Sequence, residues 1–141
     1  MAKKKQTSFK TFESFTEHAQ HLRIAHNMMD SAAWKELDPY DVVVYLEFKR
    51  RYNGKKDNES DISLTYEEMK KKMDKERFKK SIDRLIEVGF IDLVKHRAQQ
   101  RKATIYGLSN RWRYYGTQLF EEGKKRAKLS RRSSMETAGK K

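Results

Sequence analysis

Residues 74–108 constrain the fold more than any other stretch, because a helix with clear start and stop signals leads directly into a hairpin. Asp74 can cap the start of this helix, and Gly89 can take the left-handed conformation that ends helices. The β-prone residues at 90–94 and 103–108 predict two antiparallel strands. A helix that continues into a small antiparallel sheet predicts the α+β class.

Capping signals predict further helices ahead of this unit. Residues 30–37 begin with Asp and Ser and predict a short helix, and Asp38-Pro39 starts a central helix that is apolar on nearly all sides. Residues 62–64 alternate as a short strand does. Thr65 and Glu68 then form a capping box for a helix that is expected to reach about residue 73. The predicted core thus has three to four helices and a small sheet.

The positive charge is concentrated at the two ends of the sequence. The whole chain has a formal net charge of +13, yet residues 9–94 carry 16 basic and 17 acidic side chains. Residues 1–8 carry three lysines, and residues 95–141 carry 14 basic against three acidic side chains. A balanced body with basic extensions favours a polyanionic partner such as nucleic acid. The alternative is a solubilising tail.

Composition excludes several other classes. There is no cysteine, which excludes disulfides and thiolate metal sites and fits a cytoplasmic protein. No apolar run approaches the ~20 residues of a membrane span, and no signal peptide is expected at the basic start. His18, His21 and His26 lack a metal-ligand spacing, and no nucleophile–base motif or glycine-rich phosphate loop is present. We therefore expect no metal, no cofactor, no membrane partner and no enzymatic activity.

Five short segments stand in this order along the chain: Asp30-Ser31-x-Ala33-Trp34-x-x-Leu37, Arg51-Tyr52-Asn53-Gly54, Ile62-Ser63-Leu64-Thr65-Tyr66, Leu85-Ile86-Glu87-x-Gly89-Phe90-Ile91 and Lys102-Ala103-Thr104-x-Tyr106-x-Leu108. Together they resemble a group of small bacterial winged-helix proteins from plasmids, phage and integrative elements. The group includes DNA-binding domains of replication initiators and accessory proteins of conjugative transfer. The resemblance covers roughly residues 22–115 and implies a winged helix-turn-helix that binds duplex DNA. It divides the chain into a basic, partly disordered lead (1–21), the winged-helix domain (22–115) and a flexible basic tail (116–141).

The last predicted helix has the charge pattern of a recognition helix. Its apolar residues fall on one face, and its outward face has a basic stripe beside an acidic one. Basic side chains on such a helix can donate to guanine O6 and N7 in the major groove. The alternative is a solvated face stabilised by i,i+4 ion pairs. The predicted DNA contacts are Lys75, Arg77, Lys80 and Arg84, with Glu76, Asp83 and Glu87 as acidic neighbours.

The hairpin tip and the chain that follows it supply further basic candidates. The tip can press on phosphates or reach the minor groove, although a polar turn kept soluble by charge is the alternative. Trp112 is expected to close the core, while its basic neighbours touch phosphates. The predicted wing contacts are Lys95, Arg97, Gln99, Gln100, Arg101 and Lys102. The predicted backbone contacts are Arg111, Arg113, Lys124, Lys125 and Arg126.

These features predict binding to double-stranded DNA at defined sites on a mobile element, in replication, conjugative transfer or transcription regulation. A domain of this size would mark the site for larger replication or transfer proteins. Two rival functions remain open: an RNA- or ribosome-associated protein with the same basic tail, and an adaptor that binds proteins. The oligomeric state, monomer or homodimer, is also open.

Overall fold

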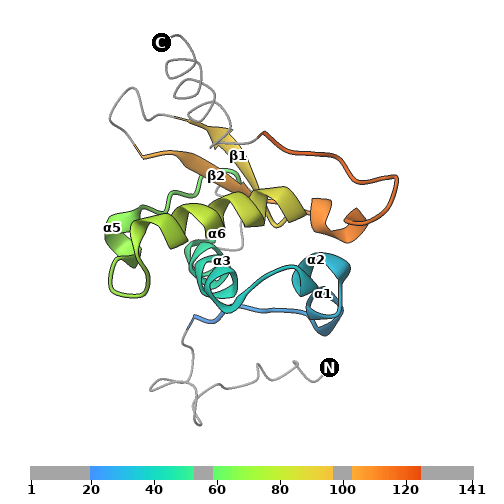
Figure 1. The fold of residues 1–141 in the computed structure, drawn as a ribbon, viewed down its shortest axis with the longest axis horizontal. Helices are drawn as coiled ribbons and strands as arrows, with labels where there is room; N and C mark the ends of the chain where they lie inside the picture. Colours follow the sequence, from blue (N-terminus) through green and yellow to red (C-terminus); the bar gives the residue numbers. More distant parts are fainter. Residues whose placement is uncertain (1–19, 53–58, 97–102, 125–141) are drawn as a thin grey trace, which may run out of the picture.

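The computed structural model describes residues 20–52, 59–96 and 103–124. These residues form an α+β structure with five α-helices, one 3₁₀ helix and a two-stranded antiparallel sheet. In Figure 1, α6 lies across the middle of the molecule, with the hairpin on one side and α3 on the other. The elements are α1 (His26–Met29), α2 (Ala32–Lys35), α3 (Pro39–Arg51), α5 (Tyr66–Met69), α6 (Lys75–Val88), β1 (Ile91–Lys95), β2 (Ile105–Leu108) and the 3₁₀ helix η2 (Arg111–Tyr114).

The predicted start and stop of α6 are confirmed. The Asp74 carboxylate accepts a hydrogen bond from the backbone N–H of Arg77 at 2.8 Å. At the other end Gly89 has φ +95°, and its N–H donates to the carbonyls of Leu85 and Ile86. This left-handed residue satisfies carbonyls that the helix end would otherwise leave unpaired. It also turns the chain directly into β1.

The predicted cap of α3 and the capping box of α5 are likewise confirmed, and the structure adds a reciprocal capping box at the start of α3. Asp38 and Asp41 accept hydrogen bonds from each other's backbone N–H groups, both at 3.0 Å. The Glu68 carboxylate accepts from the backbone N–H of Thr65 at 2.9 Å and from its hydroxyl at 3.2 Å. However, α5 ends at Met69, short of the predicted residue 73. The chain has to leave the helix there, because the cap of α6 needs extended backbone one turn later.

The sheet is smaller than predicted on one side. β1 and β2 pair with Ile91 opposite Leu108 and Leu93 opposite Tyr106. The segment predicted as a strand at 62–64 contributes only a single bridge, in which Ile62 and Tyr106 exchange hydrogen bonds of 2.9 and 2.7 Å. That bridge still ties the chain ahead of α5 to the outer edge of β2.

The core lies between α3, α6 and the hairpin, and an aromatic cluster closes one end of it. Trp34 packs edge-on against Phe90, and Trp112 stacks on Phe90 with ring centroids 5.8 Å apart. The expectation that Trp112 closes the core is therefore confirmed. Burial raises the pKa of Tyr45 in this cluster to about 12. The buried apolar residues are Ala33, Val44, Tyr45, Phe48, Ile62, Leu64, Met69, Met73, Phe78, Ile82, Leu85, Ile86, Val88, Phe90, Ile91 and Tyr106.

Packing contacts continue past residue 115, where the tail was predicted to begin. Phe120 lies edge-on against Tyr115, with ring centroids 5.3 Å apart, and also lies against the Arg111 guanidinium. Residues 119–124 form no helix. Within the described ranges, no helix has the length and apolar character needed to cross a membrane.

Candidate functional site

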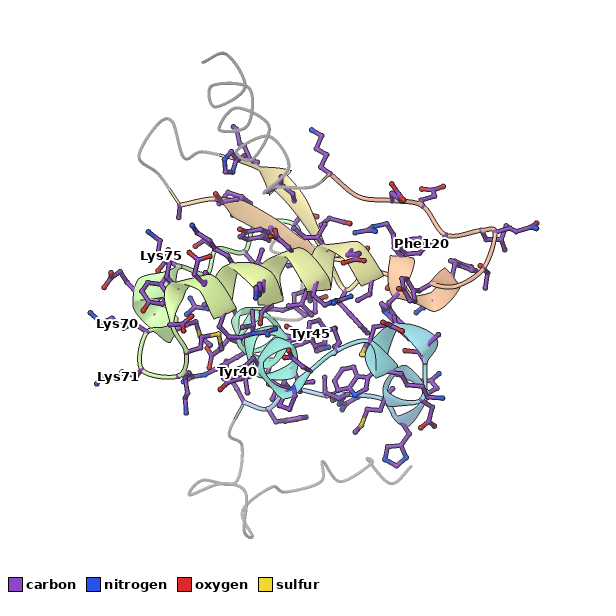
Figure 2. All side chains as sticks on the ribbon, viewed as in Figure 1. Tyr40, Tyr45, Lys70, Lys71, Lys75 and Phe120 are labelled. Carbon is purple, nitrogen blue, oxygen red and sulfur yellow. The ribbon has the colours of Figure 1, made fainter. Side chains whose placement is uncertain are left out.

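Six lysines gather where α5 passes into α6. Figure 2 shows Lys70, Lys71 and Lys75 together at this end of the molecule. These lysines lie close together because the short turn after α5 leads directly into the first two turns of α6. We call this group the lysine cluster. Its members are Lys70, Lys71, Lys72, Lys75, Lys79 and Lys80, and all six are exposed.

Charge on the outer face of α6 changes along the helix. The first half carries Lys75, Lys79 and Lys80 with Glu76 as its acidic neighbour. The second half carries Asp83 and Glu87, and Arg84 there lies 3.6 Å from the Glu87 carboxylate. The positive charge on the outer face of α6 is therefore concentrated in the first half of the helix.

Most of the cluster is available for an external ligand. Among the described residues, Lys75 and Lys80 have no hydrogen-bond or ion-pair partner. Lys70 donates to Glu67 at 3.0 Å, and this bond raises the pKa of Lys70 above its ordinary value. Lys70 is therefore charged at neutral pH.

An ion pair joins α3 to α5, the helix that leads into the lysine cluster. Arg51 at the end of α3 lies 3.1 Å from the Glu68 carboxylate on α5. Burial alone would raise the pKa of Glu68, but the hydrogen bonds from Thr65 and the charge and hydrogen bond of Arg51 lower it overall. Glu68 is therefore ionised at neutral pH and holds α5 against α3.

Arg77 is turned away from the outer face of α6. Its Nη2 atom donates to Asp38 at 2.7 Å and to Asp41 at 2.9 Å, and its guanidinium lies over the Tyr40 ring. Asp41 is only 1% exposed, so Arg77 neutralises a buried carboxylate. The sequence interpretation assigned Arg77 to base contact. The structure instead gives it partners at the start of α3, because helix packing brings that cap against the first turn of α6.

The hairpin places two further polar side chains on the surface. Lys95 and His96 are exposed at the end of β1, and the His96 ring lies 3.4 Å from the Thr104 hydroxyl across the hairpin. The remaining predicted contacts lie outside the described residues. They are Arg97, Gln99, Gln100, Arg101 and Lys102 in the hairpin, and Lys125 and Arg126 after the last described residue.

The predicted backbone contacts after β2 divide into two kinds. Arg113 is exposed and lies beside the Trp112 ring, and Lys124 is exposed at the end of the described chain. Arg111 has a side chain only 15% exposed and bonds to Asp92 at 2.6 Å. It was predicted to touch phosphates, but its guanidinium is occupied within the protein.

Sequence reasoning missed four of the six lysines in the cluster. Lys70, Lys71 and Lys72 were absorbed into the predicted helix after Thr65, and Lys79 was not among the predicted DNA contacts. A signal was present, since three consecutive lysines directly before a helix cap indicate a basic turn.

In the described part of the chain, no group of three or more histidine or acidic side chains is arranged to hold a metal ion. Comparison with protein-family models, curated proteins and solved structures finds no match to this chain.

Proposed function

We propose that this protein is a winged-helix protein that binds duplex DNA, with α6 as its recognition helix and the β1–β2 hairpin as its wing. The observation that carries the proposal is the lysine cluster at the start of α6. Recognition helices contact base edges through their N-terminal residues, and Lys75 and Lys80 lie in that half of α6. The order of helices and strands and the bonding of Ile62 to the hairpin agree with this architecture.

The proposal assigns different work to the different lysines. Lys75, Lys79 and Lys80 enter the major groove, where an ammonium group can donate to guanine O6 and N7. Lys70, Lys71 and Lys72, in the turn before α6, contact the adjacent phosphates. Such contacts set the register of the protein on the duplex without reading the base sequence. Arg77 fixes the start of α6 against α3 rather than reading bases. Asp83 and Glu87 face away from the phosphates, because the second half of α6 leaves the groove.

The location of the DNA site is proposed from the resemblance to proteins of mobile elements. That resemblance implies a site on such an element, which larger replication or transfer proteins then use.

Removing charge from the cluster should weaken DNA binding more than removing the same charge elsewhere. We expect Lys75→Gln/Lys80→Gln to raise the Kd for duplex DNA about thirtyfold, since each of the two lost contacts is worth on the order of 1 kcal/mol. The matched control is Arg23→Gln/Lys35→Gln, which removes two exposed charges from the segments around α1 and α2. Fluorescence anisotropy on a labelled duplex measures both. Equal losses for the two pairs would show that charge alone matters, and the assignment of α6 would be wrong.

The same anisotropy titration, repeated with a labelled structured RNA, separates the rival functions. Binding to structured RNA as tight as to duplex DNA would favour the RNA-associated function. Weak duplex binding without any sequence preference, unchanged by either pair, would favour the protein adaptor.

A further inference from the structure

The chain after η2 is held by a single arginine. Arg111 donates from Nε to Asp92 at 2.6 Å and from Nη1 to the carbonyl of Glu121 at 3.0 Å. Its Nη2 donates to the carbonyls of Ile86 and Ile91, both at 2.9 Å. Every nitrogen of the guanidinium therefore has a partner, and these partners belong to α6, β1 and the chain after η2. Arg111 therefore joins the junction between α6 and β1 to the chain after η2.

The chain packs closely over this arginine. We call residues 117–124 the strap. The Phe120 ring centroid lies 5.7 Å from the guanidinium carbon of Arg111, and the Phe120 ring also packs edge-on against the Tyr115 ring. A Cβ atom on Gly123 would lie 2.6 Å from Arg111 Nη2, so the strap approaches the guanidinium as closely as only glycine allows. Figure 2 places Phe120 at the end of α6 opposite to the lysine cluster.

The strap runs back toward the hairpin. Figure 1 draws it passing from η2 in that direction. Arg111 binds the Glu121 carbonyl and the Asp92 side chain at once, which places the strap beside β1. Residues 124–132 then carry six basic side chains and no acidic one. The strongest run of positive charge in the chain therefore starts at a fixed point next to the proposed wing.

We propose that the strap is a positioning device: Arg111 fixes where the basic C-terminal extension begins, so that the extension and the hairpin contact neighbouring phosphates of one duplex. This inference rests on the proposed function. A tethered second contact gains from a high effective concentration near its target, and that gain falls when the tether is loosened or redirected. Arg111 is thus a positioning residue for DNA binding, although its own guanidinium faces the protein.

The test is a double-mutant cycle in the full chain. Phe120→Ala loosens the strap without removing the bond from Arg111 to Asp92. The tail is neutralised by changing Lys125, Arg126, Lys128, Arg131 and Arg132 to Gln. We expect Phe120→Ala to raise the Kd for a labelled random-sequence duplex about threefold to tenfold when the tail is intact, and to have no effect when the tail is neutralised. Leu119→Ala is the matched control, because Leu119 is 71% exposed.

Arg111→Lys loosens the strap from the other side and keeps the charge. Since it also breaks bonds to α6 and β1, its thermal unfolding is measured alongside its affinity. It should show the same dependence on the tail as Phe120→Ala. Equal losses with and without the tail charges would overturn the inference while leaving the proposed function standing. Absence of duplex binding by the unaltered chain would overturn both.

Discussion

Replacing Gly89 with alanine should lower the free energy of unfolding by about 2–5 kcal/mol. A residue with a Cβ atom loses about 1–2 kcal/mol in the left-handed conformation, and Gly89 has φ +95°. The new methyl group would also lie 2.5 Å from the backbone nitrogen of Trp112 and 2.7 Å from the carbonyl carbon of Arg111. Such overpacking typically costs a further 1–3 kcal/mol, about as much again as the conformational strain. Urea unfolding followed by tryptophan fluorescence measures the loss.

Gly116 provides the matched control for this prediction. It also has a positive φ, +85°, but the nearest atom to its added Cβ is a methyl group 4.0 Å away. Gly116→Ala should therefore show the conformational cost alone, about 1–2 kcal/mol. Equal destabilisation by the two substitutions would mean that the chain around Trp112 moves aside, and that the junction between α6 and the hairpin is looser than described.

Replacing Arg77 with alanine should cost about 2–4 kcal/mol of stability, because it leaves the Asp41 carboxylate buried without its cation. Breaking one side of a buried ion pair typically costs about 3–5 kcal/mol, and the 27% exposure of the Arg77 side chain places the expected loss at or below this range. The loss should nearly vanish when Asp41 is already Asn, since the carboxylate that requires the guanidinium is gone. Chemical unfolding of the two single variants and the double variant measures this coupling.

Arg84→Ala is the control on the same helix. Arg84 lies 3.6 Å from Glu87, with both side chains about half exposed, and such surface pairs contribute about 0–1 kcal/mol. If Arg77→Ala proves no more destabilising than Arg84→Ala yet weakens DNA binding strongly, Arg77 contacts DNA as the sequence interpretation held. Its role in positioning α6 would then be wrong.

Local signals explain the parts of the fold that sequence predicted well. Capping residues such as Asp38 and Asp74 act on backbone groups within one turn, so their effect is legible in the sequence itself. The four-residue helix α1 and the 3₁₀ helix η2 were not predicted, because one turn gives no hydrophobic period to detect. The strand at 62–64 was overestimated because alternation shows only that pairing is possible, not how many partners the sheet edge offers.

The candidate site likewise has features that the sequence could predict and features that depend on tertiary packing. Positive charge in the turn and the hairpin could be read from composition, whereas the fate of each arginine depended on tertiary packing. Arg77 meets Asp41 across 36 residues and Arg111 meets Asp92 across 19 residues. A helical wheel places Arg77 beside Lys80, but it cannot show that the cap of α3 lies against one of them. Solvent-facing and protein-facing cations therefore look alike until the helices are packed.

The most direct test of the central claim is the salt dependence of duplex binding by the unaltered chain. If the lysine cluster, the hairpin and the C-terminal extension together neutralise about 5–8 phosphates, log Kd should rise linearly with log salt concentration with a slope of about 4.5–7. Fluorescence anisotropy over a series of salt concentrations measures this slope. A slope near zero, or no binding to duplex DNA at low salt, would contradict the account.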